Sequence, residues 1–502
     1  MYQSEIRPSQ INDLLEKVRQ RKYGQYLLSV IIDKARSIEG KRVDFNFPVT
    51  AVVGPNGGGK TTIAGAAAIL YKDIAPADFF AKSGKYDSSM LNWRIEYEVI
   101  DRSVKANDTV RRTAKYHNAK WVRNSLQREV IVFGVSRTVP AAERKELRRC
   151  VSNKFYVEDD KIEALSTTVA SSVSSILDKD VSQFKHMRVD QKGYVTLLAG
   201  VDFNGDSYSE FHFGAGESSV IRMVSQLESA SENSLVIVEE IENGLHPVAT
   251  MRMVEYLVEL AERKKIQAIF TTHSNDALIP LPNAAIWASV NGELYNGKLD
   301  IRSLRAITGQ VNSRLVIFVE DDFAEKWVFH LLSAMDGVAI DAISIHPMNG
   351  DGVAVRVHKH HELDPSAKQP SICIIDGDSE QVASDDAGIY RLPGSDPEST
   401  VFDCLLMNID AISGELAVAL LKPYEFESKL EAIMSSVRNT TREPHLLFSQ
   451  LGKKIGLIPE ERVKDACISI WCRMNPDVVA RLEEKLGDVL PKETDSVEEK
   501  TG

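Results

Sequence analysis

The sequence predicts an α/β fold class in which two consecutive α/β domains precede a helical region. Short apolar runs predict buried strands within 49–54, 234–240 and 314–320, and helical segments lie between them. The 502 residues exceed the roughly 250–300 that one hydrophobic core supports, so we expect more than one domain. With 43% hydrophobic residues the chain can bury sizeable cores, which excludes a disordered protein.

The expected elements follow in order along the chain. A helix is expected within residues 1–23. The first α/β domain is expected over 24–310, where alternating strands give way to apolar strands and a helix at 248–263. The second α/β domain is expected over 311–410. Residues 411–502 are predicted to be mostly helical and to end in a polar, disordered tail.

Targeting and redox signals are absent from the sequence. No apolar run reaches the roughly 18 residues that a membrane span needs, and the charged N-terminus has no apolar signal-peptide core. Five scattered cysteines form no Cys-x-x-Cys pair, so we expect reduced thiols and no zinc site. These features predict a cytoplasmic protein without a membrane partner.

Charge is distributed unevenly along the chain, whose net charge is −12. Residues 1–150 hold 27 Lys and Arg against 16 Asp and Glu, whereas the other 352 residues hold 33 against 56. The basic excess concentrates in 102–149, with 13 basic and 4 acidic residues. This segment is either a localised face for a polyanion such as nucleic acid or an Arg-rich β-meander that is only solvated.

A glycine-rich loop is the strongest functional signal. Residues 54–61 read Gly-Pro-Asn-Gly-Gly-Gly-Lys-Thr between a predicted strand and a predicted helix, which is a complete P-loop. In such a loop the backbone N–H groups surround the phosphates of ATP, the lysine neutralises their outer oxygens, and the Thr hydroxyl holds Mg²⁺. The residues expected to contact ATP or its Mg²⁺ are Gly54, Asn56, Gly57, Gly59, Lys60, Thr61 and Thr62.

A second acidic strand end follows, as a P-loop enzyme requires. The sequence SLVIVEE and the IENGLHP after it resemble the Walker B motif and D-loop of ABC-type ATPases of the SMC-like and DNA-repair kind. The resemblance implies that Glu239 supports Mg²⁺ and that Glu240 is the general base. It also implies that His273, at the next strand end, senses the γ-phosphate. Because these ATPases usually have Asp where Glu239 stands, slow hydrolysis, or binding alone, stays open.

A loop before Walker B is positioned like an ABC signature. Residues 213–219 read Phe-Gly-Ala-Gly-Glu-Ser-Ser and open a predicted helix, whose N-terminus can bind phosphate. By this resemblance Gly214, Gly216 and Glu217 would contact ATP held by a second copy. We therefore expect a homodimer or a higher homo-oligomer.

A separate group of carboxylates follows the ATPase segment. Glu320 ends one predicted strand, and Asp376 and Asp378 end another 56 residues later. Three carboxylates suit one or two Mg²⁺ ions, or Mn²⁺, that could hold a phosphodiester for attack. An ordinary α/β domain with acidic helix caps is the alternative. The pattern resembles a Toprim domain, and an ABC-type ATPase followed by Toprim resembles the OLD (overcoming lysogenization defect) family, which implies Glu398 as a further metal ligand.

Two features of that family are displaced in this sequence. The second acid expected after Glu320 could be Asp321, Asp322 or Glu325. A late catalytic lysine is also expected, for which the sequence offers Lys453 or Lys454.

The resemblance implies an ATP-regulated, Mg²⁺-dependent DNA endonuclease of the OLD type in bacterial anti-phage defence. The alternative is an ABC-type ATPase sensor or scaffold whose Toprim-like domain is not catalytic. Such a protein would control a separate effector nuclease or a retron-type nucleoprotein complex. A topoisomerase, a long-armed SMC protein and a transporter subunit are less consistent with the sequence, which has no nucleophilic-Tyr domain, sustained heptads or transporter-type signature that we recognise.

Overall fold

The computed structural model divides into two compact units, residues 1–301 (unit 1) and 302–502 (unit 2), and each is described by itself. The expected boundary at 310/311 and the predicted disordered tail after 492 lie outside the described residues. The described residues are 4–87, 90–152, 154–190, 192, 195–202, 204–290, 292–297, 313–348, 350–363, 369–423, 426–487 and 489–492.

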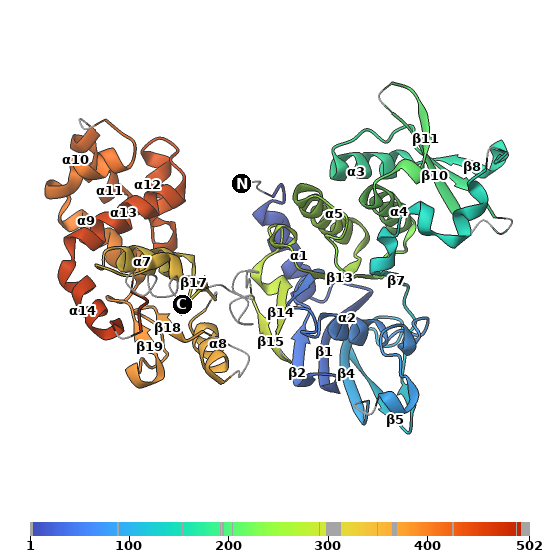
Figure 1. The fold of residues 1–502 in the computed structure, drawn as a ribbon, viewed down its shortest axis with the longest axis horizontal. Coiled ribbons are helices and arrows are strands. Elements are labelled where there is room, and N and C mark those ends of the chain that lie inside the picture. Colours follow the sequence, from blue (N-terminus) through green and yellow to red (C-terminus); the bar gives the residue numbers. More distant parts are fainter. Residues whose placement is uncertain are drawn as a thin grey trace, which may run out of the picture. The chain divides into compact units, whose positions relative to one another are not determined.

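Unit 1 is built around a six-stranded sheet in the order β15-β14-β3-β13-β12-β7 (Figure 1). All neighbouring strands are parallel except β14 and β15, which form a hairpin. Helix α5 (Pro247–Lys264) packs on β13 and β3, and its buried face is rich in Val, Leu and Met. The strands are β3 (Val49–Val53), β7 (Val130–Phe133), β12 (Leu235–Val238), β13 (Gln267–Thr272), β14 (Ile286–Val290) and β15 (Glu293–Asn296).

A second, antiparallel sheet of unit 1 has the order β2-β1-β4-β5-β6. Helix α2 (Lys60–Ala68) contacts both β1 of this sheet and β3, β12 and β13 of the first. Its sequence KTTIAGAAA is buried on nearly every side, as expected for a helix between two layers. The strands are β1 (Gln25–Ala35), β2 (Ile38–Asp44), β4 (Trp93–Asp101), β5 (Thr109–His117) and β6 (Lys120–Arg123).

The rest of unit 1 comprises α1 (Pro8–Arg19), within the N-terminal helix expected from sequence, and a small antiparallel sheet in the order β11-β10-β9-β8. Strands β10 and β11 form a hairpin, whose second strand is short because a 3-10 turn begins at Glu210. Helices α3 (Thr167–Leu177) and α4 (Ala215–Ser229) pack together beside it. The strands are β8 (Ile162–Ala164), β9 (Lys185–Arg188), β10 (Thr196–Val201) and β11 (Ser207–Ser209).

Unit 2 has a four-stranded parallel sheet in the order β17-β16-β18-β19. Helices α7 (Asp322–Ser333) and α8 (Asp351–Leu363) connect the first three strands. The strands are β16 (Leu315–Val319), β17 (Ile343–Pro347), β18 (Ser371–Ile375) and β19 (Ile389–Arg391).

The C-terminal helices of unit 2 share one hydrophobic core with its sheet. Trp327 of α7 meets Trp471 edge to face, with ring centroids 4.9 Å apart, and Phe323 stacks on Phe448 at 5.4 Å. The expected domain boundary at 410/411 lies within α10. The structure therefore shows no domain boundary between the sheet and the helices of unit 2. These helices are α9 (Pro397–Met407), α10 (Ile409–Ala419), α11 (Glu427–Thr440), α12 (Leu447–Lys454), α13 (Glu460–Met474) and α14 (Pro476–Leu486).

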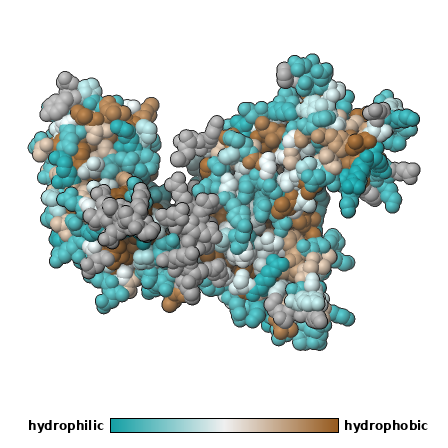
Figure 2. Space-filling model, in the orientation of Figure 1, coloured by the Kyte–Doolittle hydropathy of each residue, from teal (hydrophilic) through white to brown (hydrophobic). Residues whose placement is uncertain are grey.

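The surface mixes hydrophilic and hydrophobic residues on the face drawn in Figure 2. On α9, α10 and the turn after them, Met407, Val418 and Leu421 are each more than half exposed. All five cysteines are free, as predicted. Among the described residues, no helix is both long and apolar enough to cross a membrane.

Candidate functional site

The P-loop of unit 1 is held against β14 by close backbone contact. A Cβ on Gly54 would lie 2.1 Å from the carbonyl oxygen of Ser289, and Gly59 has a left-handed φ of +104° at the start of α2. Glycine is therefore required at both positions. The Ser289 hydroxyl donates to the Gly58 carbonyl at 2.6 Å, which fixes the loop further.

Lys60 turns back over this loop. Its ammonium donates to the carbonyl oxygens of Gly54 and Pro55, each at 2.9 Å. Burial lowers the pKa of Lys60, against the opposing effect of Glu240 and Glu242. Within the described part of the chain no carboxylate forms an ion pair with it, so its charge is available to an anion. A cradle that only glycines fit and a buried ammonium beside it suit a polyphosphate.

A cleft of about 420 Å³ opens beside Lys60. Most of the predicted nucleotide contacts line it together with both Walker B glutamates, whereas Gly54 lies behind the loop as an acceptor for Lys60. The predicted lining residues are Asn56, Gly57, Gly59, Lys60, Thr61, Thr62, Glu239 and Glu240. Those that sequence reasoning missed are Arg36, Ser37, Gly58, Val135 and Thr271.

The Walker B glutamates are held in a defined backbone conformation. Glu240 has a left-handed φ of +47°, and its amide donates to the Thr271 hydroxyl at 2.9 Å. Arg137 donates to the carbonyls of Glu239 and Glu240, both at 2.6 Å. Burial lowers the pKa of Arg137, while Glu242, Glu240 and Glu239 oppose that shift. The backbone of Glu240 is strained in this conformation, and hydrogen bonds at its amide and at its carbonyl hold it there. Such strain is typical of functional sites.

His273 lies close enough to the cleft that the charges of Lys60, Glu240 and Glu242 affect its pKa. Its backbone N–H donates to Glu242 at 2.6 Å, and the Thr272 hydroxyl donates to the same carboxylate at 2.7 Å. Burial and then Lys60 lower the pKa of His273, whereas Glu242 and Glu240 raise it. The imidazole is therefore favoured in its neutral form, which can accept or donate a hydrogen bond.

The signature-like residues occupy the start of α4 and do not line this cleft. Gly214 is the exposed N-cap, and Glu217 pairs with Lys179 at 2.6 Å. A Cβ on Gly216 would lie 1.9 Å from the carbonyl oxygen of Gly244, so the signature-like loop rests directly on the segment after Walker B.

Much of the basic segment 102–149 points into unit 1. Arg123 donates to three backbone carbonyls, Arg128 is buried against the Tyr71 hydroxyl and Gln267, and Arg144 pairs with the buried Glu210. On β5, exposed Arg111 lies opposite Glu98. Lys105, Lys115, Lys120, Lys145, Arg148 and Arg149 are exposed as well. The excess of positive charge is therefore partly structural and partly at the surface, and the segment fits either interpretation.

Unit 2 brings the predicted carboxylates together at one edge of its sheet. Strands β16 and β18 are parallel neighbours with Val319 opposite Ile374, so Glu320 and Asp376 follow them side by side. Glu320 accepts a hydrogen bond from the Asp376 amide at 3.0 Å. Asp378 is exposed on the same loop, which Arg391 holds through the carbonyls of residues 376, 377, 379 and 381.

Asp376 is a buried acid in an acidic neighbourhood. It is 6% exposed, and its Oδ1 has no hydrogen-bond partner. Burial, followed by the charges of Asp321, Glu320, Asp378 and Glu398, raises the pKa of Asp376 to about 8. An orphaned oxygen among several carboxylates fits a divalent cation, because the cation would neutralise the group and occupy the empty acceptor.

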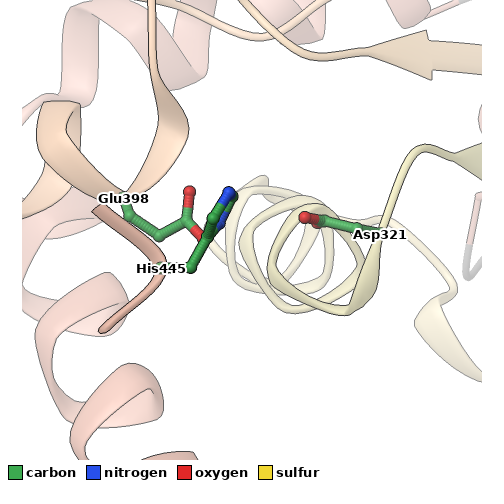
Figure 3. A group of neighbouring side chains, drawn as sticks. All are labelled: Asp321, Glu398 and His445. Atoms are coloured by element: carbon green, nitrogen blue, oxygen red, sulfur yellow. The ribbon is translucent and has the colours of Figure 1, made fainter. Parts of the chain in front are cut away.

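Asp321, Glu398 and His445 converge beside it (Figure 3). One ligand atom from each lies within 4.8 Å of the others, and His445 Nδ1 is 2.6 Å from Glu398 Oε1. Burial raises the pKa of Glu398, and His445 opposes this shift. Of the three acids that sequence allowed after Glu320, Asp321 is the one in this group; Asp322 and Glu325 are not.

The lysines predicted for this centre point elsewhere. Lys453 and Lys454 are exposed on α12, and Lys454 donates to the Ser436 hydroxyl at 2.7 Å. The residue that reaches the carboxylates is instead His445, from the turn before α12.

The parallel pairing of β7 and β12 could have revealed Arg137, which the sequence analysis did not identify. Phe133 lies opposite Val238, so the chain after β7 must run beside Glu239 and Glu240, and Arg137 lies there. Arg36, Ser289 and His445 carry no such local signal.

Two family models match parts of unit 1. One, described as "AAA domain, putative AbiEii toxin, Type IV TA system", matches residues 120–279, and one described as "AAA domain" matches residues 29–193. No curated protein matches the chain.

Several solved structures match about half of this chain. The SMC head domain from Thermotoga maritima is 13% identical, with a TM-score of 0.35 over 54% of this chain and 99% of its own. The Smc head domain bound to the C-terminal domain of ScpA, derived from Pyrococcus furiosus, is 11% identical, with 0.39 over 56% and 98%. The recombination mediator protein RecF with ATP is 12% identical, with 0.32 over 55% and 99%. The family matches and the P-loop cleft together identify an α/β ATPase domain in unit 1.

Proposed function

We propose that this chain is an ABC-type ATPase whose nucleotide state controls a metal-dependent DNA endonuclease centre in unit 2. The nuclease proposal rests on one observation. Glu320, Asp321 and Glu398 lie close to Asp376, whose buried Oδ1 has no hydrogen-bond partner. The cytoplasmic setting is the expectation from the scattered cysteines and the missing targeting signals, whereas the homodimer and the role in bacterial anti-phage defence come from the sequence resemblance.

In unit 1 the chain's own residues would bind and orient ATP. The P-loop amides would surround the phosphates, while Lys60 would exchange its loop carbonyls for phosphate oxygens. Thr61 and Glu239 would hold Mg²⁺, which neutralises phosphate charge when bound. Glu240 would take a proton from the attacking water, and Arg137 would keep Glu240 in its left-handed conformation.

Closure of two copies would complete the nucleotide site. Gly214, Gly216 and Glu217 lie at the start of α4 and outside the cleft of their own chain. A helix N-terminus with small residues can bind the phosphate of nucleotide held by a second copy. This arrangement supports a dimer whose formation depends on ATP.

In unit 2 the carboxylates would hold one or two divalent ions. Glu320, Asp376 and Glu398 are buried, Asp321 is half-buried and Asp378 is exposed, so the group extends from the interior of unit 2 to its surface. Bound metal supplies charge stabilisation and orientation for phosphodiester hydrolysis.

A second function is favoured by the position of the lysines. Because Lys454 contacts Ser436 and no described lysine is seen to pair with Glu398 or Asp376, unit 2 could serve as a non-catalytic scaffold. The ATPase would then control a separate effector nuclease or a retron-type nucleoprotein complex.

Cleavage assays with the purified chain distinguish these functions. Supercoiled plasmid, linear DNA and RNA are incubated with Mg²⁺ or Mn²⁺, with and without ATP. The wild type is compared with Asp376→Ala/Asp378→Ala and with a matched control, Asp385→Ala/Asp386→Ala, which alters two exposed acids of the same unit. Cleavage lost only in the first double variant supports the nuclease. No cleavage by any form overturns it in favour of the scaffold.

Glu240→Gln tests the control step. We expect this variant to bind ATP and to hydrolyse it about 100-fold more slowly or worse, because a general base is removed. If its DNA cleavage equals that of the wild type with and without ATP, the nucleotide does not control the nuclease.

A further inference from the structure

We propose that Asp321, Glu398 and His445 form a site for a first-row transition-metal dication, such as Mn²⁺, in which His445 Nδ1 supplies a nitrogen ligand. The inference deepens the proposed cleavage centre and rests on that proposal, because it concerns the same pocket. It goes beyond the family expectation, in which carboxylates alone hold Mg²⁺ or Mn²⁺ and a lysine assists.

The three ligands come from separate elements that converge. Asp321 precedes α7, Glu398 lies in the first turn of α9, and His445 is in the turn before α12. In Figure 3 the Asp321 carboxylate points toward the other two side chains. Their ligand atoms lie within 4.8 Å of one another, a spacing that one ion with bonds of roughly 2.0–2.2 Å can bridge after small side-chain movements.

Each side chain has an atom that can face a metal ion. Asp321 accepts the amides of Phe323 and Ala324 through Oδ1, which fixes the carboxylate and leaves Oδ2 to the pocket. The Glu398 side chain is almost completely buried, and its Oε1 contacts His445 Nδ1. The His445 side chain is 73% exposed, so it could rotate toward an ion without disturbing the core.

An independent observation points into the same pocket. Asp376 is more than nine-tenths buried, and its Oδ1 has no hydrogen-bond partner although Asp321 and Glu398 act on it electrostatically. Arg391, the cation of this loop, donates to backbone carbonyls and not to these carboxylates. A dication would give this buried carboxyl a partner that no described side chain supplies to its Oδ1.

The nitrogen ligand sets the metal preference. Mg²⁺ prefers oxygen ligands and octahedral geometry, whereas imidazole suits metals such as Zn²⁺ and Fe²⁺. A nitrogen ligand beside two carboxylates therefore favours first-row transition-metal dications over Mg²⁺. Mn²⁺ is the practical probe because it is paramagnetic.

The test measures metal binding directly, without nucleic acid or nucleotide. Full-length, chelator-treated protein is titrated with Mn²⁺ and separately with Mg²⁺ by calorimetry. Electron spin-echo modulation of the bound Mn²⁺ then reports any coordinated ¹⁴N. The variants are His445→Ala and, as the matched control, His360→Ala, which removes an exposed histidine of α8 in the same unit.

We expect His445→Ala to weaken Mn²⁺ binding about 10- to 100-fold, to change Mg²⁺ affinity far less and to abolish the ¹⁴N signal. His360→Ala should behave as the wild type. Asp321→Asn, which can still cap α7, should weaken both metals and so locate the site. No ¹⁴N signal in the wild type, or equal loss of both metals in His445→Ala, overturns the inference.

The two proposals fail separately. A chain that binds Mn²⁺ through nitrogen but cleaves no nucleic acid overturns the nuclease and leaves the metal site standing. A chain that cleaves DNA without the nitrogen signal overturns only the role of His445.

Discussion

The nucleotide cleft of unit 1 and the carboxylate pocket of unit 2 are assembled in opposite ways. The cleft depends on one continuous loop, whose glycines press against Ser289 and whose lysine is buried with carbonyl partners. The pocket draws its residues from the ends of β16 and β18 and the starts of α9 and α12, and it gathers like charges.

The difference lies in what each site needs from its ligand. The cleft is shaped by backbone contacts that exist without a ligand, and its ammonium has neutral acceptors until phosphate arrives. The pocket concentrates carboxylates that repel one another, and His445 beside Glu398 offsets only part of that repulsion, so a bound cation would lower it further. Metal binding should therefore raise the stability of unit 2. Removal of the nucleotide should leave the shape of the cleft in unit 1 nearly unchanged.

The largest expected effect is the loss of nucleotide binding in Lys60→Ala. Removing the buried ammonium costs a charge-assisted contact of about 3 kcal/mol, so the affinity for ATP should fall roughly 100-fold or more. Calorimetric titration with ATP measures this, and Lys120→Ala, an exposed lysine of β6, is the matched control. Unchanged ATP affinity in Lys60→Ala would break the assignment of the P-loop.

The next effect concerns Arg137, which holds the Walker B carbonyls. Arg137→Ala should lower kcat for ATP hydrolysis about 10- to 100-fold while KM stays nearly constant, because Glu240 loses its positioning partner. Arg137→Lys should restore only part of kcat, since an ammonium lacks the planar fork that reaches both carbonyls. Equal losses in kcat and in nucleotide affinity would indicate a merely structural role.

Charge repulsion in unit 2 predicts that Asp376→Asn stabilises the metal-free protein. Replacing a buried, unpartnered carboxyl by a neutral amide should raise the free energy of unfolding by about 2 kcal/mol, or Tm by roughly 4–8 °C. Calorimetry checks this with Asp341→Asn, an exposed acid, as the control. Added Mn²⁺ should then stabilise the wild type more than Asp376→Asn. A lower Tm for metal-free Asp376→Asn contradicts the charge argument.

The smallest expected effects test whether the close backbone contact at Gly216 of unit 1 is rigid. Gly216→Ala should lower the free energy of unfolding by about 1–3 kcal/mol, because its Cβ would meet the Gly244 carbonyl at 1.9 Å. Gly214→Ala, two residues earlier with open space around its Cβ, should change stability by less than about 1 kcal/mol. Similar values for both variants would mean that the backbone contact can relax.

The nucleotide cleft was largely predictable because its signal is local. Eight residues around Lys60 specify the loop, and the acidic strand end at Glu239 and Glu240 follows from one apolar run. Arg36 and Ser289 were not predictable, since their place in the site depends on tertiary contacts, and the left-handed turn at Arg36 carries no sequence mark.

The carboxylate pocket was only partly predictable. Adjacent parallel strands explain why Glu320 and Asp376 meet, but spacing alone could not choose among the acids after Glu320. The structure brings in Asp321 because it caps α7 beside the pocket. His445 comes from a turn whose position is set by packing of the C-terminal helices, and no periodicity reports such packing.

The contacts that complete the fold of unit 2 determine when each of the two sites can form during synthesis of the chain. The last described residues pair back onto the segment after α7, where Val338 bridges to Lys492 and the Ala339 amide donates to Pro491. During synthesis, unit 1 can complete its sheet once β15 has left the ribosome, whereas unit 2 must wait almost 200 residues longer. Each new chain would therefore complete its nucleotide cleft before its carboxylate pocket.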